Sequence, residues 1–256
     1  MGDAVLALDR VPADDFGFTL GLRDAVGGDR FVRLGQCGHL TLVQAAPVRT
    51  FRWSRGLGHF PGWWWSVTTG HHVGYESWLE RDHVRALDYD RDVVGIASQP
   101  FWLHWSDDRR KRRHAPDYFA RLADGSGVVI DVRADDAIEP KDAEAFAVTA
   151  QACEQVGWRY RRVGVLDPVL AGNVRWLARY RHPRCAGRAE IGQRLREVFA
   201  SPAPLLATAE RAGDRIAVLP ALFHLIWQQE LVADLAAARL GPTTLVTTAG
   251  SVGGAR

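Results

Sequence analysis

Apolar and polar residues alternate with changing periods along the chain, and these periods predict its first elements. From Arg30 to Val67, apolar residues alternate with polar ones and are rich in Val, Phe and Trp. This pattern predicts two or three strands interrupted by Gly and Pro. From Glu76 to Leu87, the apolar residues Leu79, Val84 and Leu87 follow a helical spacing. The first part of the chain is therefore expected to run from strands into a helix.

The middle of the chain predicts a hairpin between further strands and a helix. Residues 93–105 are apolar and β-branched, with Gln99-Pro100 as an interruption, and predict a strand. Two short β-rich runs follow a charged turn at 107–113 and are joined by a Gly-rich turn at 123–127. Beyond them, an Ala-rich helix is expected at 142–156 and another strand at 158–165. This order predicts a mixed α/β core.

The pattern changes at Asp167-Pro168, where a domain boundary is expected. Helices are predicted beyond it, followed by two short strands, which is the plan of a winged helix; the helices fall at 170–180, 191–199, 204–212 and 219–229, and the strands at 230–235 and 243–247. We therefore expect a domain over 1–166 with a loosely ordered start at 1–30. A second domain is expected over 167–248, with a flexible Gly/Ser-rich tail at 249–256.

Composition limits the class of protein. The 256 residues are 47% hydrophobic and 24% charged, with a net charge of only +2, as in an ordinary globular protein. No apolar run is long enough to span a membrane, and no leader pattern opens the chain, so a cytoplasmic protein is expected. The three cysteines (Cys37, Cys153 and Cys185) form no CxxC pair, which argues against a zinc site or a disulfide framework.

Two acids flank the predicted hairpin. Asp117 opens its first run, and Asp131 ends its second, two residues before Arg133. Hydrolysis of a phosphodiester needs an activated water and neutralised phosphate oxygens, and carboxylate-bound Mg²⁺ can supply both. Asp117, Asp131 and the carbonyl of Val132 are candidate ligands, and Glu80 from the preceding helix would complete the set. Arg133 shares a strand face with Asp131 and is a candidate for holding the phosphate.

Other candidates have weaker support. The acids themselves have a structural alternative, in which Asp117 ends a strand and Asp131 pairs with an arginine. Glu76 lies four residues before Glu80 and is an accessory candidate, since both would share a helix face. The run Trp63-Trp-Trp65 fits a base-stacking platform or ordinary packing. His71 and His72 project differently, so one of them is a candidate ligand or DNA contact, and an exposed loop without function is the alternative.

The residues resemble the TnsA-like endonuclease subunit of heteromeric transposases. The resemblance rests on Ser77-Trp-Leu-Glu80, Val94-Gly-Ile-Ala-Ser-Gln-Pro-Phe, Pro116-Asp117-Tyr-Phe and Ile130-Asp131-Val-Arg133. It covers residues 70–166 well, 167–248 loosely and 1–30 not at all. It implies a PD-(D/E)xK restriction-endonuclease-like fold, with a mixed sheet flanked by helices, joined to a winged-helix-like α+β domain.

The resemblance also implies roles for single residues. The metal ligands of that family fall on Glu80, Asp117 and Asp131, and its lysine falls on Arg133. Arginine stabilises charge but does not release its proton, so proton removal would pass elsewhere. Lys141, just before the next helix, is an accessory candidate for that task.

The resemblance implies a function as well. We expect an Mg²⁺-dependent endonuclease, with Mn²⁺ as a substitute, that cuts the 5′ ends of a transposon in double-stranded DNA. Its partner would be a DDE transposase. A catalytically impaired DNA-binding adaptor and a stand-alone restriction or repair nuclease are the alternatives. Arginines of the C-terminal domain are candidates for DNA contact or an ordinary solvated face: Arg188, Arg194, Arg196, Arg211 and Arg215.

Overall fold

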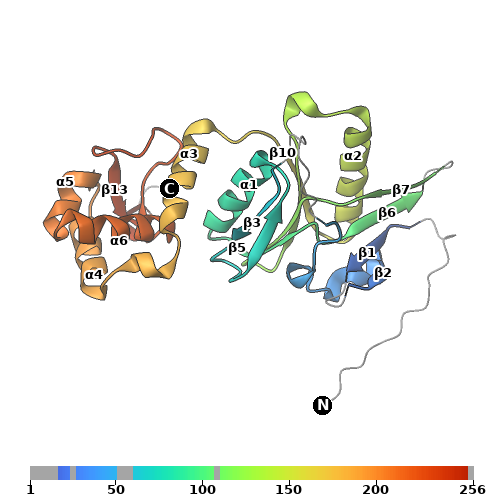
Figure 1. Cartoon of the computed structure of the whole chain (residues 1–256), viewed down its shortest axis with the longest axis horizontal. Helices are drawn as coiled ribbons and strands as arrows, with labels where there is room; N and C mark the ends of the chain where they lie inside the picture. The colour runs from blue at the N-terminus through green and yellow to red at the C-terminus, as the bar shows by residue number, and fades with distance from the viewer. Residues whose placement is uncertain (1–16, 24–26, 51–59, 107–109, 253–256) are drawn as a thin grey trace, which may run out of the picture. The chain divides into compact units, whose positions relative to one another are not determined.

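The computed structural model describes residues 17–23, 27–50, 60–106 and 110–252, which form two compact units (Figure 1). The first unit comprises the described residues of 1–84 and 92–165. The second comprises residues 85–91 and those from 166 onward. The chain is mixed α/β, as predicted. The break at Val165–Leu166 lies beside the expected boundary, whereas the assignment of 85–91 to the second unit was not anticipated.

The central sheet of the first unit has the order β10-β9-β8-β5. Its strands are β5 (Val93–Ser98), β8 (Tyr118–Leu122), β9 (Gly127–Val132) and β10 (Arg159–Val163). The predicted hairpin is present, because β8 and β9 pair antiparallel around the Gly125 turn. Strand β10 then pairs parallel with β9, and helix α2 (Pro140–Gln155) makes the crossover between them.

A second sheet in this unit has the order β2-β1-β6-β7 and is entirely antiparallel. Its strands are β1 (Thr19–Arg23), β2 (Asp29–Arg33), β6 (Trp102–Ser106) and β7 (Lys111–His114). One face is buried, since Leu20 lies opposite both Val32 and Leu103 and all three are inaccessible. Helix α2 runs beside β6 and β7 (Figure 1).

This second sheet corrects three expectations. The loosely ordered start was wrong from Thr19 onward, because burial of Leu20 fixes β1; residues 1–16 lie outside the described residues. The charged turn at 107–113 was wrong at its end, where Lys111–His114 pair with β6; residues 107–109 are not described. The single strand at 93–105 is two strands in different sheets, because Gln99 adopts a positive φ of 44° before Pro100.

The remaining elements of the first unit include the first half of helix α1 (Trp78–Tyr89), whose residues from Arg85 onward belong to the second unit. The expected strands between Arg30 and Val67 are β2 and β3 (Gly62–Trp65), and two 3-10 helices stand between them, η1 (Leu34–His39) and η2 (Leu42–Gln44). Strand β3 pairs with β4 (His72–Tyr75). Of the tryptophans, Trp64 is buried and Trp63 is exposed, so the cluster is divided by the strand's alternation.

The second unit is built around the buried helix α6 (Arg215–Trp227). The other helices are α3 (Pro168–Leu177), η4 (Ala178–Tyr180), η5 (Pro183–Ala186), α4 (Ala189–Val198), α5 (Leu205–Ala209) and η6 (Glu210–Ala212). A small sheet of order β11-β13-β12 follows, from Ala203–Pro204, Leu245–Thr248 and Leu231–Val232. Tyr89, at the end of α1, belongs here because its ring packs on Trp227 and its carbonyl accepts a hydrogen bond from Gln229.

Two further expectations concern the end of the chain and membranes. The tail expected to be flexible begins with a 3-10 helix, η7 (Ala249–Val252), while residues 253–256 lie outside the described part. Across the described residues, the structure contains no helix with the length and apolar character needed to cross a membrane.

Candidate functional site

The predicted acids line one cleft of the first unit, with a volume of about 1020 Å³. We call it the acidic cleft; Glu76, Glu80, Asp117, Asp131 and Arg133 all line it. The structure thus brings together residues that span 57 positions of the sequence, from Glu76 to Arg133 (133 − 76). Their convergence depends on the β8–β9 pairing and on the position of α1.

Asp117 and Asp131 are brought together by the strand register. Tyr118 lies opposite Ile130, so the next pair outward is Asp117 and Asp131. The carboxylate of Asp117 accepts a hydrogen bond from the backbone N–H of Val132 at 2.7 Å. This bond fixes the Asp117 side chain against β9 while it stays partly exposed to the cleft.

Asp131 is almost completely buried, and both of its carboxylate oxygens have partners. Oδ1 lies 2.8 Å from Nε2 of His114, and Oδ2 accepts the Tyr160 hydroxyl at 2.9 Å. Neither partner was predicted as a site residue. The nearness of His114 to Asp117 in the sequence was a usable signal. Tyr160 gave none, because its approach depends on the parallel pairing of β10 with β9.

Glu80 is buried at the start of α1 and has a structural task. Its carboxylate accepts the N–H of Glu76 at 2.7 Å and the hydroxyl of Ser77 at 2.9 Å, while the Ser77 hydroxyl oxygen accepts the N–H of Glu80 at 3.1 Å. This arrangement is a variant of the capping box, which the pattern Ser-x-x-Glu also predicts. The segment that carries the family resemblance is therefore also a helix-start signal.

The electrostatics of the cleft centre on Asp117. Burial raises its pKa well above the ordinary value, and the negative charges of Glu80 and Asp131 raise it further. The hydrogen bond from Val132 and the charge of Arg49 act in the opposite direction. Burial likewise raises the pKa of Glu80, opposed by its two hydrogen bonds. Three carboxylates thus repel one another here, and a bound cation would relieve that repulsion.

Arg49 and Glu76 form an ion pair at the wall of the cleft. The expectation that Glu76 and Glu80 share a helix face was wrong, because α1 begins at Trp78 and Glu76 precedes it. Arg49 instead holds the Glu76 carboxylate. No local pattern pointed to Arg49, because it lies 27 residues from its partner in an irregular segment.

The two candidate cations beside the acids are placed differently. Arg133 lines the cleft, where its guanidinium pairs with Asp142 at 3.0 Å and donates to the carbonyl of Ala137 at 3.1 Å. Lys141 is exposed, pairs with Glu139 at 2.8 Å and is not among the residues that line the cleft. Of the two, only Arg133 lies where it could contact a molecule bound in the acidic cleft.

The oxygen atoms in the acidic cleft are of the kind that a hard divalent cation binds, but their present geometry is not that of a metal site. Carboxylate and carbonyl oxygens are the ligands that Mg²⁺ prefers. In the described part of the chain, however, no group of three or more His, Cys, Asp or Glu side chains is arranged to hold a metal ion. The reason is visible in the contacts of Glu80 and Asp131, whose oxygens face N–H and O–H donors of the protein.

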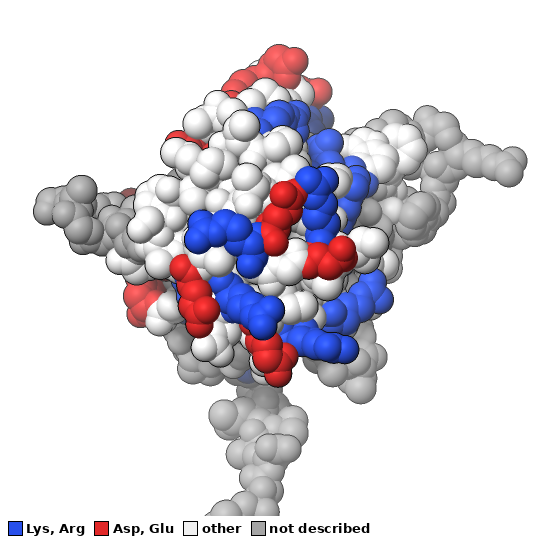
Figure 2. Space-filling view, turned by 90° about the vertical axis from the view of Figure 1, so that its left-hand side faces the viewer, with Lys and Arg blue, Asp and Glu red and all other residues white. Residues whose placement is uncertain are grey.

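The predicted DNA-binding arginines of the second unit are all exposed. Arg196 pairs with Glu230 and Arg215 with Glu210. Figure 2, which faces the end of this unit, shows acidic side chains interspersed among the basic ones. This view therefore shows a mixed surface rather than a continuous basic one.

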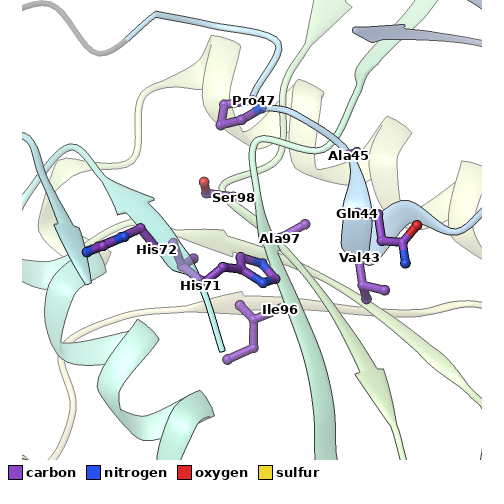
Figure 3. A pocket seen from close by; sticks show the side chains of 10 residues that line it. Val43, Gln44, Ala45, Pro47, His71, His72, Ile96, Ala97 and Ser98 are labelled. Carbon is purple, nitrogen blue, oxygen red and sulfur yellow. The ribbon is translucent and has the colours of Figure 1, made fainter. Parts of the chain in front are cut away.

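The histidine pair lies at a second, smaller cavity of about 300 Å³ in the first unit. Figure 3 shows the rings of His71 and His72 pointing in opposite directions. Nδ1 of His71 lies 3.0 Å from the carbonyl of Thr69 in its own turn. The other lining residues are mainly apolar or small, among them Val43, Pro47, Ile96 and Ala97. The two rings are thus not arranged to bind one ion.

No protein-family model matches the chain, and no curated protein matches it significantly.

Proposed function

We propose that the chain is a metal-dependent DNA endonuclease that hydrolyses phosphodiester bonds in the acidic cleft. The single observation that carries this proposal is the convergence of Asp117, Asp131 and Glu80, in which the charges of the other two acids raise the pKa of Asp117. A protein interior rarely gathers like charges without a function, since each raises the free energy of the others. A divalent cation is the ligand that this repulsion favours.

Each residue has a role in the proposed reaction. Asp117 and Asp131, with Glu80 and the carbonyl of Val132, would hold Mg²⁺ or Mn²⁺, which supplies Lewis acidity and neutralises phosphate charge. His114 and Tyr160 orient Asp131 through hydrogen bonds to its two oxygens. Arg133 is the cation that holds the attacked phosphate, since its guanidinium remains partly exposed at the cleft.

The wider function rests on the sequence resemblance. We propose that the first unit has a restriction-endonuclease-like fold and that the second is winged-helix-like and contacts DNA. Its helices followed by the β12–β13 pair support that reading. The substrate would be double-stranded DNA at transposon ends, where this chain cuts the 5′ ends and a DDE transposase acts on the 3′ ends. A stand-alone restriction or repair nuclease would use the same cleft on other DNA.

One alternative draws support from the contacts of the acids. In a DNA-binding adaptor without activity, Glu80 would serve only as a helix cap and Asp131 only as a hydrogen-bond acceptor. The same adaptor would keep Arg133 paired with Asp142. Such a protein would bind DNA and recruit the transposase without binding a divalent cation.

A nicking assay separates these functions. The substrate is end-containing DNA with Mg²⁺ or Mn²⁺, tested with and without the transposase. Asp117→Asn keeps the hydrogen-bond acceptor for Val132 but removes the charge, and we expect it to lower cleavage by about 10²–10³-fold or more. Asp124→Asn, an exposed acid in the turn of the same hairpin, is the matched control and should cleave normally. Equal cleavage by wild type and Asp117→Asn would refute the proposal.

A further inference from the structure

The outer face of the β2-β1-β6-β7 sheet carries aromatic rings and guanidinium groups. Phe31 lies opposite Gly21, Gly21 opposite Trp102, and His104 opposite Arg113. Directly opposed residues share a face of a sheet, as do residues two apart on a strand. Phe31, Trp102, His104 and Arg113 therefore form one surface, which we call the aromatic face. Core residues such as Leu20 and Leu103 occupy the other side.

The rings of the aromatic face are in contact with one another. The Phe31 and His104 rings meet edge to face, with their centres 5.5 Å apart. Gly21 permits this approach, because a Cβ at that position would come within 2.9 Å of the His104 ring. The Arg113 guanidinium lies 4.2 Å from the centre of the Trp102 ring. These contacts leave Phe31 46% exposed, so the surface presents an open ring rather than a packed core.

The aromatic face and the acids line the same cleft. Gly21, Phe31, Trp102, His104 and Arg113 line the acidic cleft together with Asp117 and Asp131. Arg23 also lines it, and its side chain lies two residues from Gly21 on the same face of the sheet. The charges on the aromatic face are mainly positive, with Arg23 and Arg113 against Asp29. Burial and the charge of Arg113 lower the pKa of His104.

We propose that the aromatic face binds unpaired nucleotides of the DNA strand whose phosphate enters the acidic cleft. This inference rests on the proposed nuclease function. Flat rings and guanidinium planes stack on any base, and nearby arginines attract phosphates, which is how proteins bind single strands without reading sequence. Bases within a duplex do not expose their faces to a protein in this way. The substrate class is therefore DNA with a frayed or single-stranded segment beside the cut.

Fluorescence anisotropy without divalent cations tests binding apart from cleavage. The probe is a labelled oligothymidine of about twelve nucleotides, within the site sizes of single-strand binders, and a blunt duplex is the comparison. We expect Phe31→Ala to weaken oligothymidine binding about 5- to 150-fold, the range for loss of one stacked base, and to leave duplex binding unchanged. If Phe31→Ala lowers the melting temperature, Phe31→Leu replaces it as the test, because leucine keeps an apolar side chain but has no ring to stack. It should also weaken oligothymidine binding.

The matched control is Trp78→Ala, which removes another exposed ring of the first unit that does not line the acidic cleft, and it should bind oligothymidine normally. A strand containing 2-aminopurine gives a direct readout, because stacking quenches its fluorescence; quenching should occur with wild type and be reduced by Phe31→Ala. Equal oligothymidine affinity of wild type and both Phe31 variants would overturn the inference. So would an equal loss on the blunt duplex.

The outcomes distinguish this inference from the function beneath it. Asp117→Asn should bind oligothymidine at least as well as wild type, because it removes a negative charge from the cleft. If Asp117→Asn still cleaves DNA, the nuclease proposal fails even when the Phe31 variants lose binding. If the Phe31 variants bind normally while Asp117→Asn is inactive, only the aromatic face fails.

Discussion

The two four-stranded sheets of the first unit contribute opposite kinds of side chain to the same cleft. The β10-β9-β8-β5 sheet contributes carboxylates at strand ends, where Asp117 precedes β8 and Asp131 lies near the end of β9. The β2-β1-β6-β7 sheet contributes rings and arginines along its strands. The acids come from two neighbouring strands and one helix, whereas the aromatic face requires strands more than 80 residues apart, from Gly21 to Trp102 (102 − 21 = 81). We infer that the first sheet carries the reacting centre and that the second provides the surface on which the DNA strand binds.

After Asp117→Asn, the largest effect is expected at Arg133, where the acidic centre would meet the phosphate. Arg133→Ala should lower cleavage about 10²–10³-fold, because it removes a cation that stabilises the transition state. Arg133→Lys should preserve or raise activity, since it keeps the charge and restores the residue type that the resemblance predicts. Lys141→Ala is the control, and nicking rates measure all three. A damaging Lys141→Ala with a mild Arg133→Ala would move proton transfer or charge stabilisation to Lys141.

A smaller effect is expected from the residues that orient Asp131. Tyr160→Phe removes one hydrogen bond from Oδ2 of Asp131 and keeps the ring. Loss of such an orienting partner typically lowers metal affinity or activity about 10- to 100-fold. Calorimetric titration with Mn²⁺ should show the weaker affinity of Tyr160→Phe. The melting temperature of this variant should change little. Unchanged affinity would mean that Asp131 needs no support from Tyr160.

The contribution of the second unit should be visible in the salt dependence of DNA binding. Arg188, Arg194 and Arg211 are exposed and make no side-chain ion pair among the described residues. If each contacts a phosphate, a triple substitution by Ala should reduce the log–log salt slope by roughly 0.9 per contact. The double variant Arg196→Ala/Arg215→Ala, whose side chains already pair with Glu230 and Glu210, should change the slope less. An unchanged slope in the triple variant would confine DNA contact to the first unit.

The smallest effect concerns stability without metal. Because burial and neighbouring acids raise the pKa of Asp117 in the folded state, the folded protein binds a proton more readily there than the unfolded chain does. Stability should therefore fall as the pH rises from the ordinary value of 3.8 through the raised pKa. Asp117→Asn should lose this part of the pH dependence. The free energy of unfolding, measured by denaturation at each pH, gives this dependence for both proteins. If it changes with pH in the same way in wild type and Asp117→Asn, the assigned repulsion around Asp117 is contradicted.

The sequence predicted the central hairpin and its acids because both depend on local signals. The turn at Gly125 needs a residue that tolerates its positive φ of 83°, and the β-rich runs on either side determine the register that opposes Asp117 to Asp131. The motif around Glu80 was equally local, although the same four residues also form a helix cap. In these segments, short-range patterns were sufficient.

The partners of the acids and the first strands could not be predicted in the same way. Tyr160 reaches Asp131 through a parallel pairing with a helical crossover, and Arg49 reaches Glu76 from an irregular segment. Strand β1 forms because Leu20 is buried between Val32 and Leu103, contacts that join distant parts of the chain. Such effects depend on tertiary packing, which overrides local propensity.

Calorimetric titration of Mn²⁺ into the whole protein tests the acidic centre most directly. Wild type and the control Asp124→Asn should bind the ion with the same affinity, and Asp117→Asn should bind it at least about tenfold more weakly, because a charged ligand is lost. Because this readout needs neither DNA nor a transposase, it separates an ion-binding nuclease centre from an adaptor. Equal affinity of wild type and Asp117→Asn, or no binding by wild type, would contradict the assignment of Asp117, Asp131 and Glu80 as a divalent-cation site.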